Sequence, residues 1–243
     1  MNLLKKLFRR TPERTRPYCA ALIAAAGSST RYGGENKLLQ ELGGMPVLAR
    51  TLLAVDRAES IDEIVIAARE DELLTYAQLC KTFDLQKPVK VVLGGATRTE
   101  SVLRAACEAS PEAALLAVQD GARPLVTSAL IDGVVLAAQQ YQAAAPAIPV
   151  TDTVKVAVNG VVESTPERSK LFAVQTPQVF DAELLKVALQ DALRANATLT
   201  DDCSAVERFG KEVHLTEGDA ENIKITRPLD LIVAEAILQS RGE

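Results

Sequence analysis

The sequence predicts a single α/β domain built on a mostly parallel β-sheet. With 243 residues, of which 48% are hydrophobic and 24% charged, the chain is long enough to bury a sizeable core, although length alone also allows two small domains. Short apolar runs alternate with longer amphipathic runs, which is the β-α-β order typical of a parallel sheet. The apolar runs expected to form buried strands are residues 19–25, 63–68, 89–93 and 115–119.

The amphipathic segments between these strands are predicted to be helices, at residues 45–57, 70–83 and 98–108. Pro46 lies near the start of the first helix, where the missing N–H of proline is tolerated. Thr97 and Glu100 have the spacing of a capping box at the start of the third. These local signals agree with the apolar pattern.

The regular alternation ends near Pro149, where a β-hairpin is predicted. Residues 153–158 and 161–164 form its strands, and Asn159-Gly160 between them is typical of a type I′ turn. A two-stranded hairpin is marginal alone in water, so its alternating valines must pack either on the chain's own core or on a partner subunit. Further elements are expected as helices at 181–194, 201–209 and 228–239 and strands at 213–216 and 223–226.

Charge is distributed unevenly along the chain. Residues 1–16 contain six Lys or Arg residues and one Glu, a charge of +5, so the net charge of −5 leaves −10 for the remainder. This leader could be a weak tether to anionic lipid or nucleic acid, but we expect a disordered, solvated segment before a domain at residues 17–243. The acidic body argues against nucleic acid as a partner.

The cysteines and the apolar runs indicate a cytoplasmic protein. The four cysteines lie far apart without a CxxC pair, so neither a disulfide framework nor a zinc site is predicted, and a reducing compartment fits best. No apolar run approaches the roughly 18 residues of a transmembrane helix. We therefore expect no membrane span.

The strongest local motif is the small-residue loop at residues 24–37, which follows the first predicted strand. Small residues let backbone N–H groups approach a polyphosphate, and Arg31 and Lys37 can neutralise its charge. The loop matches neither the Walker A motif nor the GxGxxG motif of dinucleotide-binding folds. It is interpreted as a phosphate-binding loop; the alternative is a flexible surface loop with two solvated cations.

A second motif places a carboxylate at the carboxyl end of a strand, where ligands bind in a parallel sheet. Asp120 begins the segment Asp120-Gly-Ala-Arg-Pro124. It is a natural Mg²⁺ ligand, because magnesium needs only one or two carboxylates beside phosphate oxygens and water. The alternative is that Asp120 only caps the following turn. The adjacent phosphate loop favours the metal.

Several isolated hydroxyls and cations further along the chain would suit a second phosphate, although each alone resembles ordinary surface. They are Thr153, Arg168, Thr176, Thr200 and Lys224. The sole histidine, His214, is expected to be structural, and no Ser, Cys or His triad can be assembled.

Seven motifs occur in order along about residues 18–240. They are Ala25-Ala26-Gly27 through Arg31 to Lys37, Gly94-Gly95 with Arg98 and Ser101, Asp120 to Pro124, Asp152 to Lys155, Gln175 to Gln178, Thr200-Asp201-Asp202, and Asn222 to Pro228. In these motifs the chain resembles the 2-C-methyl-D-erythritol 4-phosphate cytidylyltransferases of the non-mevalonate isoprenoid pathway.

The resemblance implies a Rossmann-like transferase fold with a hairpin arm at about residues 150–168 that makes the protein a homodimer. Arg31 and Lys37 would stabilise the transition state at the α-phosphate of CTP, with Mg²⁺ as the cofactor. The nucleotide would be held by Ala25, Ala26, Gly27, Gly94, Gly95 and Ser101, while Asp120 would serve the metal and the ribose. Arg168 and Lys224 would position the acceptor phosphate, with Arg123, Thr153, Thr176 and Thr200 nearby.

The resemblance further implies transfer of CMP from CTP to 2-C-methyl-D-erythritol 4-phosphate, with release of pyrophosphate. The alternatives are a cytidylyltransferase for another polyol phosphate such as ribitol 5-phosphate, guanylyl or adenylyl transfer, and a silent nucleotide-binding regulator. One departure concerns the loop, where many members have Pro-Lys-Gln and this chain has Asn36-Lys37-Leu38. Loss of the proline removes a φ constraint and is expected to loosen the loop. The basic leader has no counterpart in shorter members.

Overall fold

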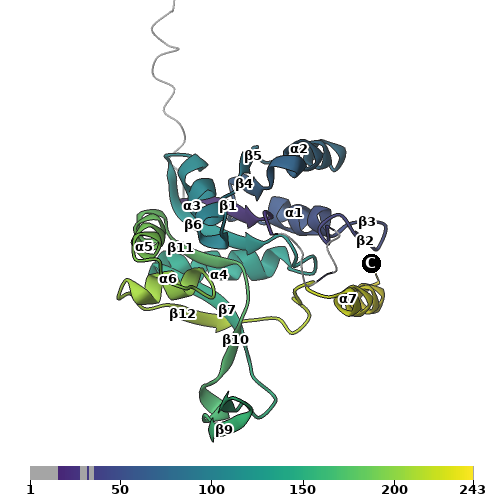
Figure 1. Ribbon diagram of the computed structural model, residues 1–243. Coiled ribbons are helices and arrows are strands. Elements are labelled where there is room, and N and C mark those ends of the chain that lie inside the picture. Colours follow the sequence, from purple (N-terminus) through teal and green to yellow (C-terminus); the bar gives the residue numbers. More distant parts are fainter. Residues whose placement is uncertain (1–15, 28–31, 33–35, 243) are drawn as a thin grey trace, which may run out of the picture.

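The computed structural model describes residues 16–27, Tyr32 and residues 36–242 (Figure 1). The predicted leader falls almost wholly outside these residues. Arg16, at its end, is described, and its guanidinium lies 2.7 Å from a carboxylate oxygen of Asp62. Arg31 also lies outside the described residues.

An eight-stranded sheet forms the centre of the described part of the chain. Its strand order is β10-β7-β11-β6-β1-β4-β5, with β12 paired to β7. Strands β10 and β11 run antiparallel to their neighbours, and the other pairs are parallel, so the predicted mostly parallel sheet is confirmed. The strands are β1 (Tyr18–Ala24), β4 (Glu63–Ala68), β5 (Val89–Leu93), β6 (Ala113–Asp120), β7 (Ala143–Pro149), β10 (Phe172–Val174), β11 (Gln178–Asp181) and β12 (His214–Glu217).

Helices cover both faces of the sheet, because side chains of each strand point alternately to the two faces. Cys19, Ala21 and Ile23 of β1 join one apolar cluster with α1, α2, α4 and α7, and Ala20 and Leu22 join the other with α3, α5 and α6. The helices are α1 (Val47–Arg57), α2 (Leu73–Thr82), α3 (Arg98–Glu108), α4 (Ser128–Tyr141), α5 (Ala182–Arg194), α6 (Asp202–Arg208) and α7 (Pro228–Arg241). Among these described helices, none is long and apolar enough to cross a lipid bilayer.

Several predicted boundaries need correction. The helix predicted from residue 45 begins at Val47, because Met45–Pro46 (β3) pairs with Glu41–Leu42 (β2) in a small hairpin. The helix predicted at 70–83 starts with a separate 3₁₀ turn, Glu70–Glu72 (η3). Elements α4, β7, β10 and β11 were not predicted.

The strand predicted at residues 223–226 is wrong, because this segment forms a loop. Its backbone makes one bond across to the β6–α4 connection, from the Ile225 N–H to the Ala122 carbonyl at 2.8 Å. Within the described chain no strand pairs with this segment. Its apolar residues pack into the core, and Lys224 lies beside Asp120.

The predicted hairpin forms an arm, defined here as residues 150–168, that extends away from the body (Figure 1). Its strands are β8 (Val156–Val158) and β9 (Val161–Ser164), which pair only with each other within the described chain. Asn159 and Gly160 both have positive φ, 51° and 80°, as the predicted type I′ turn requires. The 3₁₀ turn Arg168–Lys170 (η4) and β10 lead the chain back into the sheet.

Candidate active site

A pocket of about 390 Å³ opens at the carboxyl edge of the sheet, where β1 and β6 end. Parallel sheets bind ligands at this edge, because the strands end there and the loops can surround a molecule. The predicted residues that line the pocket are Ala25, Ala26, Gly27, Lys37, Gly95, Ser101, Asp120 and Lys224. Motifs spread over 200 residues of sequence therefore come together around one cavity.

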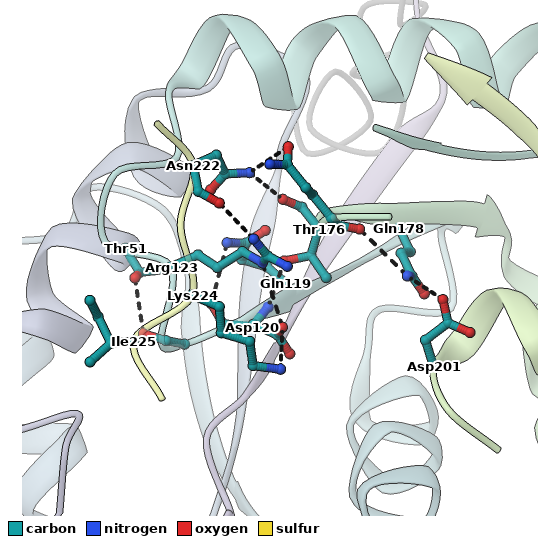
Figure 2. A network of polar contacts seen from close by, with 12 residues as sticks. Thr51, Gln119, Asp120, Arg123, Thr176, Gln178, Asp201, Asn222, Lys224 and Ile225 are labelled. Carbon is teal, nitrogen blue, oxygen red and sulfur yellow. Dashed lines mark hydrogen bonds and ion pairs between the residues drawn. The ribbon is translucent and has the colours of Figure 1, made fainter. Parts of the chain in front are cut away.

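Asp120 is the buried carboxylate of this pocket and contacts cations from separate segments. Lys224 Nζ lies 2.7 Å from Oδ2, Arg123 Nε lies 3.6 Å from Oδ2, and an Arg98 guanidinium nitrogen lies 3.6 Å from Oδ1 (Figure 2 labels Lys224 and Arg123). Burial alone would raise the pKa of Asp120, but the charges of Lys224, Arg98 and Arg123 outweigh it and lower the pKa to about 2. The carboxyl is therefore ionised at neutral pH, and we call these four side chains the Asp120 cluster.

A network of hydrogen bonds behind the pocket fixes the Asp120 cluster (Figure 2). The Asp120 N–H donates to Thr176 Oγ1 at 3.1 Å, and Arg123 Nη1 donates to the Asn222 carbonyl at 2.6 Å. Asn222 Nδ2 in turn donates to the Thr176 carbonyl at 3.0 Å. Thr176 and Arg123 were predicted to contact substrate; the structure places both behind Asp120, buried, where they hold the cluster.

A second ion pair joins the pocket to α6. Arg98 Nη1 lies 2.7 Å from Oδ2 of Asp202, whose side chain is 1% exposed. Burial raises the pKa of Asp202, and the charge of Arg98 and its hydrogen bond offset this only in part. Gln178 orients the same turn, because its Oε1 accepts from the Asp202 N–H at 3.0 Å. Arg98 thus bridges two acidic side chains while lining the pocket.

Neither Arg98 nor Asp202 was among the predicted site residues, although both lie in recognised motifs. Arg98 directly follows the Thr97 cap of α3, and Asp202 directly follows the Asp201 cap of α6. The helix dipole explains an acidic residue at such a position, as at Asp202, but it disfavours a cation such as Arg98 there. The available signal was that both motifs place a charge at the start of a helix.

The loop after β5 requires glycine for close packing. A Cβ at Gly94 would lie 2.6 Å from the Ala26 Cβ and 3.0 Å from Ser101 Oγ, so only glycine lets the two loops approach this closely. Ser101 Oγ accepts from the Gly95 N–H at 3.0 Å. Gly94, Gly95 and Ser101 therefore shape this side of the pocket.

Lys37 reaches across the pocket mouth, where its Nζ donates to the Ile225 carbonyl at 2.7 Å. The preceding Asn36 was expected to loosen the loop by replacing a proline. Residues 28–31 and 33–35 of that loop lie outside the described residues. Asn36 itself is held by hydrogen bonds: Nδ2 donates to Glu72 and, at 3.0 Å, to Tyr76 Oη, while Oδ1 accepts from the Leu38 N–H at 2.9 Å. Side-chain hydrogen bonds here fix the backbone that the proline would have constrained.

The remaining predicted acceptor residues do not line the pocket of this chain. Thr153 and Arg168 lie on the arm, where Arg168 Nη1 donates to the Thr151 carbonyl at 2.9 Å. Thr200 is exposed just before α6. Within the described residues the structure thus places the nucleotide-side residues and Lys224 together and leaves these three apart.

A cationic pocket at the carboxyl edge of a mostly parallel sheet, beside a loop of small residues, defines a protein of the α/β nucleotidyltransferase class. The family comparison narrows this class. The sequence model of the family described as 2-C-methyl-D-erythritol 4-phosphate cytidylyltransferase matches residues 19–240, and the chain belongs to that family.

Individual relatives agree with this membership. The 2-C-methyl-D-erythritol 4-phosphate cytidylyltransferase of Synechococcus sp. is 44% identical over 91% of this chain and 97% of its own length. That of Caldanaerobacter subterraneus is 43% identical over 90% and 98%. The crystal structure of 4-diphosphocytidyl-2C-methyl-D-erythritol synthase from Anaerococcus prevotii covers 92% of this chain and 96% of its own, with a TM-score of 0.83 and 31% identity.

The depressed pKa of Asp120 predicts a pH dependence of stability. Because the folded-state pKa of about 2 lies below the unfolded value, ionised Asp120 stabilises the fold above about pH 4 and this contribution is lost as pH falls towards 2. The free energy of unfolding, measured by urea denaturation from pH 5 to pH 3, should fall about 1 kcal/mol more in the wild type than in Asp120→Asn. Exposed Glu112→Gln is the control and should follow the wild type. Parallel curves for wild type and Asp120→Asn would show that the cluster does not hold this carboxyl ionised.

Proposed function

We propose that this chain transfers CMP from CTP to 2-C-methyl-D-erythritol 4-phosphate, giving 4-diphosphocytidyl-2-C-methyl-D-erythritol and pyrophosphate in isoprenoid precursor biosynthesis. The observation that carries the proposal is the Asp120 cluster, which places Lys224 and Arg98 at a pocket beside the loop of small residues and Lys37. Membership of the cytidylyltransferase family supports the choice of both substrates.

The reaction brings together two anions that repel each other. An oxygen of the acceptor phosphate forms the new bond to the α-phosphorus of CTP, and the bond from this phosphorus to the leaving pyrophosphate breaks. The attacking phosphate is already anionic at neutral pH, so no side chain has to remove a proton. The work of the protein is to orient the two substrates and neutralise charge. Lys37 and Lys224 are placed for this at the pocket, and Arg31 is proposed to assist from the loop.

The chemistry of the pocket fits one magnesium ion. Asp120 is ionised, and among the described residues the ion pair of its Oδ1 is the longer one to Arg98, at 3.6 Å. Among the described residues no three Asp, Glu, His or Cys side chains gather as a metal site. We therefore propose Asp120 as the protein ligand, with phosphate oxygens and water at the other positions. A bound ion would add positive charge beside the polyphosphate.

The arm supports the proposal of a homodimer. Exposed valines cover it, among them Val156 at 45%, Val161 at 70% and Val162 at 53%. Among the described residues these valines belong to neither apolar core cluster, and an isolated hairpin is marginal in water, so a second copy of the chain is the proposed cover. In such a dimer the arm would carry Thr153 and Arg168 to the acceptor side of the partner's pocket.

A cytoplasmic location is proposed from the cysteines. All four are free, and Cys19, Cys80 and Cys203 are buried, as suits a protein kept in a reducing compartment.

The proposed function is tested by incubating the purified protein with CTP, Mg²⁺ and one acceptor, and measuring pyrophosphate release. We expect turnover with 2-C-methyl-D-erythritol 4-phosphate and little with ribitol 5-phosphate, and GTP and ATP should not replace CTP. CTP binding without pyrophosphate release would instead identify a nucleotide-binding regulator.

The same assay tests the site. Lys37→Ala should lower kcat by about 10²- to 10³-fold, the usual loss for one group that stabilises transition-state charge. Exposed Lys211→Ala is the matched control and should leave kcat unchanged. A folded Lys37→Ala protein with normal turnover would remove Lys37 from the mechanism.

Complementation between inactive subunits tests whether the arm acts across a dimer. Arg168→Ala alone should lower kcat/KM for the acceptor about 10- to 150-fold, the value of a charge-assisted contact, and leave CTP binding nearly intact. Co-expression with Lys37→Ala subunits should restore about a quarter of wild-type activity, because half of the dimers are mixed and each mixed dimer has one intact site.

If Arg168 served its own subunit, every mixed-dimer site would carry one lesion and no activity would return. A wild-type protein that is monomeric by light scattering and fully active would also contradict the proposed dimer.

A further inference from the structure

A second pocket lies behind the active-site loop, between α1, the β6–α4 connection and the end of α7. Its volume is about 370 Å³, within the range of roughly 300–1,000 Å³ common for small-molecule sites. It shares no lining residue with the active-site pocket. The proposed transfer reaction uses none of its side chains.

The pocket combines cations with an apolar floor. Its charged lining residues are Arg50, Arg57 and Arg241, and none of its lining residues, all of which the structure describes, is acidic. Leu53, Leu125 and Leu238 are among the apolar residues between them. A site of this kind suits a ligand that has both a negative group and a hydrocarbon part.

The sequence of α1 builds one wall of this pocket. Arg50, Leu53, Ala54 and Arg57 have the spacing i, i+3, i+4 and i+7, so they share one face of the helix, with cations at both ends and apolar residues between. The fully buried residues of α1, such as Leu48, Leu52 and Val55, belong to the core cluster instead. Of the Arg50 to Arg57 face, only Ala54 packs partly against this cluster, so core packing does not account for Arg50, Leu53 and Arg57.

The three arginines differ in the ion pairs and hydrogen bonds that they make within the protein. Arg241 is paired with Glu221 at 2.7 Å, and Arg50 donates to the carbonyls of Leu42 at 2.7 Å and Gly43 at 2.9 Å. Arg57 is exposed in the last turn of α1 and makes no ion pair within the described part of the chain. A ligand anion would give Arg57 a partner.

We propose that this pocket binds a small amphipathic organophosphate, with its phosphate or diphosphate group at the arginines and a short hydrocarbon chain along the leucines. An arginine fork matches phosphate oxygens, and burial of the methylene groups of the chain favours binding. The limited volume selects a short chain over a membrane lipid.

The pocket is also connected to the active site. Its wall includes Pro124 and Leu125, which continue directly from Arg123 of the Asp120 cluster, and Arg241 Nη1 donates to the Leu125 carbonyl at 3.3 Å. Arg241 also pairs with Glu221, the neighbour of Asn222 whose carbonyl accepts from Arg123. Arg241 therefore contacts both segments that position the Asp120 cluster, and a ligand bound at Arg241 would act on them through this side chain.

Calorimetric titration of the wild-type protein with n-hexyl phosphate, in saturating CTP without acceptor, tests the proposal. We expect saturable binding, about tenfold or more tighter than that of methyl phosphate, which lacks the chain. Arg57→Ala should weaken the binding about tenfold or more. Arg194→Ala, which removes another exposed last-turn arginine, from α5, and Arg168→Ala, which alters the proposed acceptor site, should both bind as the wild type does.

Equal affinity for hexyl and methyl phosphate would overturn the proposal, and so would binding that is unchanged in Arg57→Ala. Loss of binding in Arg168→Ala would also overturn it, because it would place the ligand in the acceptor site. Sedimentation with phosphatidylglycerol vesicles distinguishes a membrane lipid from a free organophosphate. Binding to vesicles that depends on Arg57 would show that the ligand is a membrane surface, which would overturn the proposal. The titration does not use turnover, so it stands or fails separately from the proposed transfer reaction.

Discussion

The site depends on one buried carboxylate held by cations from three parts of the chain. Asp120 ends β6, Arg98 begins α3, Arg123 follows in the same loop as Asp120, and Lys224 comes from the loop before α7. A buried charge without partners would destabilise the fold strongly, whereas paired and hydrogen-bonded charges are tolerated. The parallel sheet makes this pairing possible, because its central strands end at the same edge and bring the loops that follow them together.

The same arrangement explains how the cations of the pocket can be held in position before any phosphate binds. Cations gathered without an anion would repel each other and disperse into solvent, so Asp120 and Asp202 keep Arg98 in place while it lines the pocket. Groups fixed in advance need no reorganisation during reaction, which is the main source of electrostatic catalysis. The network through Thr176 and Asn222 extends this rigidity to the loop that carries Lys224.

The sequence predicted most elements to within one or two residues, including α5, α6, α7 and β12, but it missed α4, β7, β10 and β11. The predicted bounds of β4, β5 and α3 agree with the structure, because these elements have clear apolar periodicity or an end signal such as Thr97. Strand β7 was missed because alanines dominate it and alanine favours helices. In this sheet the small side chains of β7 are buried between the layers of the fold. Residues 223–226 were wrongly predicted to form a strand, because apolar residues that are buried in a loop give the same sequence pattern as a buried strand.

For the site, motifs in single loops predicted Lys37, Asp120 and the small-residue positions. The supporting roles of Arg123 and Thr176, and the bridge from Arg98 to Asp202, depend on contacts between segments far apart in sequence. Local patterns carry no information about such contacts. Only the assembled sheet shows which charges meet.

Asp120 and its cations form one interacting unit, and a double-mutant cycle on Asp120→Asn and Lys224→Met tests this most directly. The free energies of unfolding of the wild type, the two single variants and the double variant would be measured by urea denaturation at pH 7. We expect a coupling energy of about 1 kcal/mol or more, because residues in direct contact do not act additively. Additivity within roughly 0.3–0.5 kcal/mol would show that the ion pair at 2.7 Å does not hold the site together.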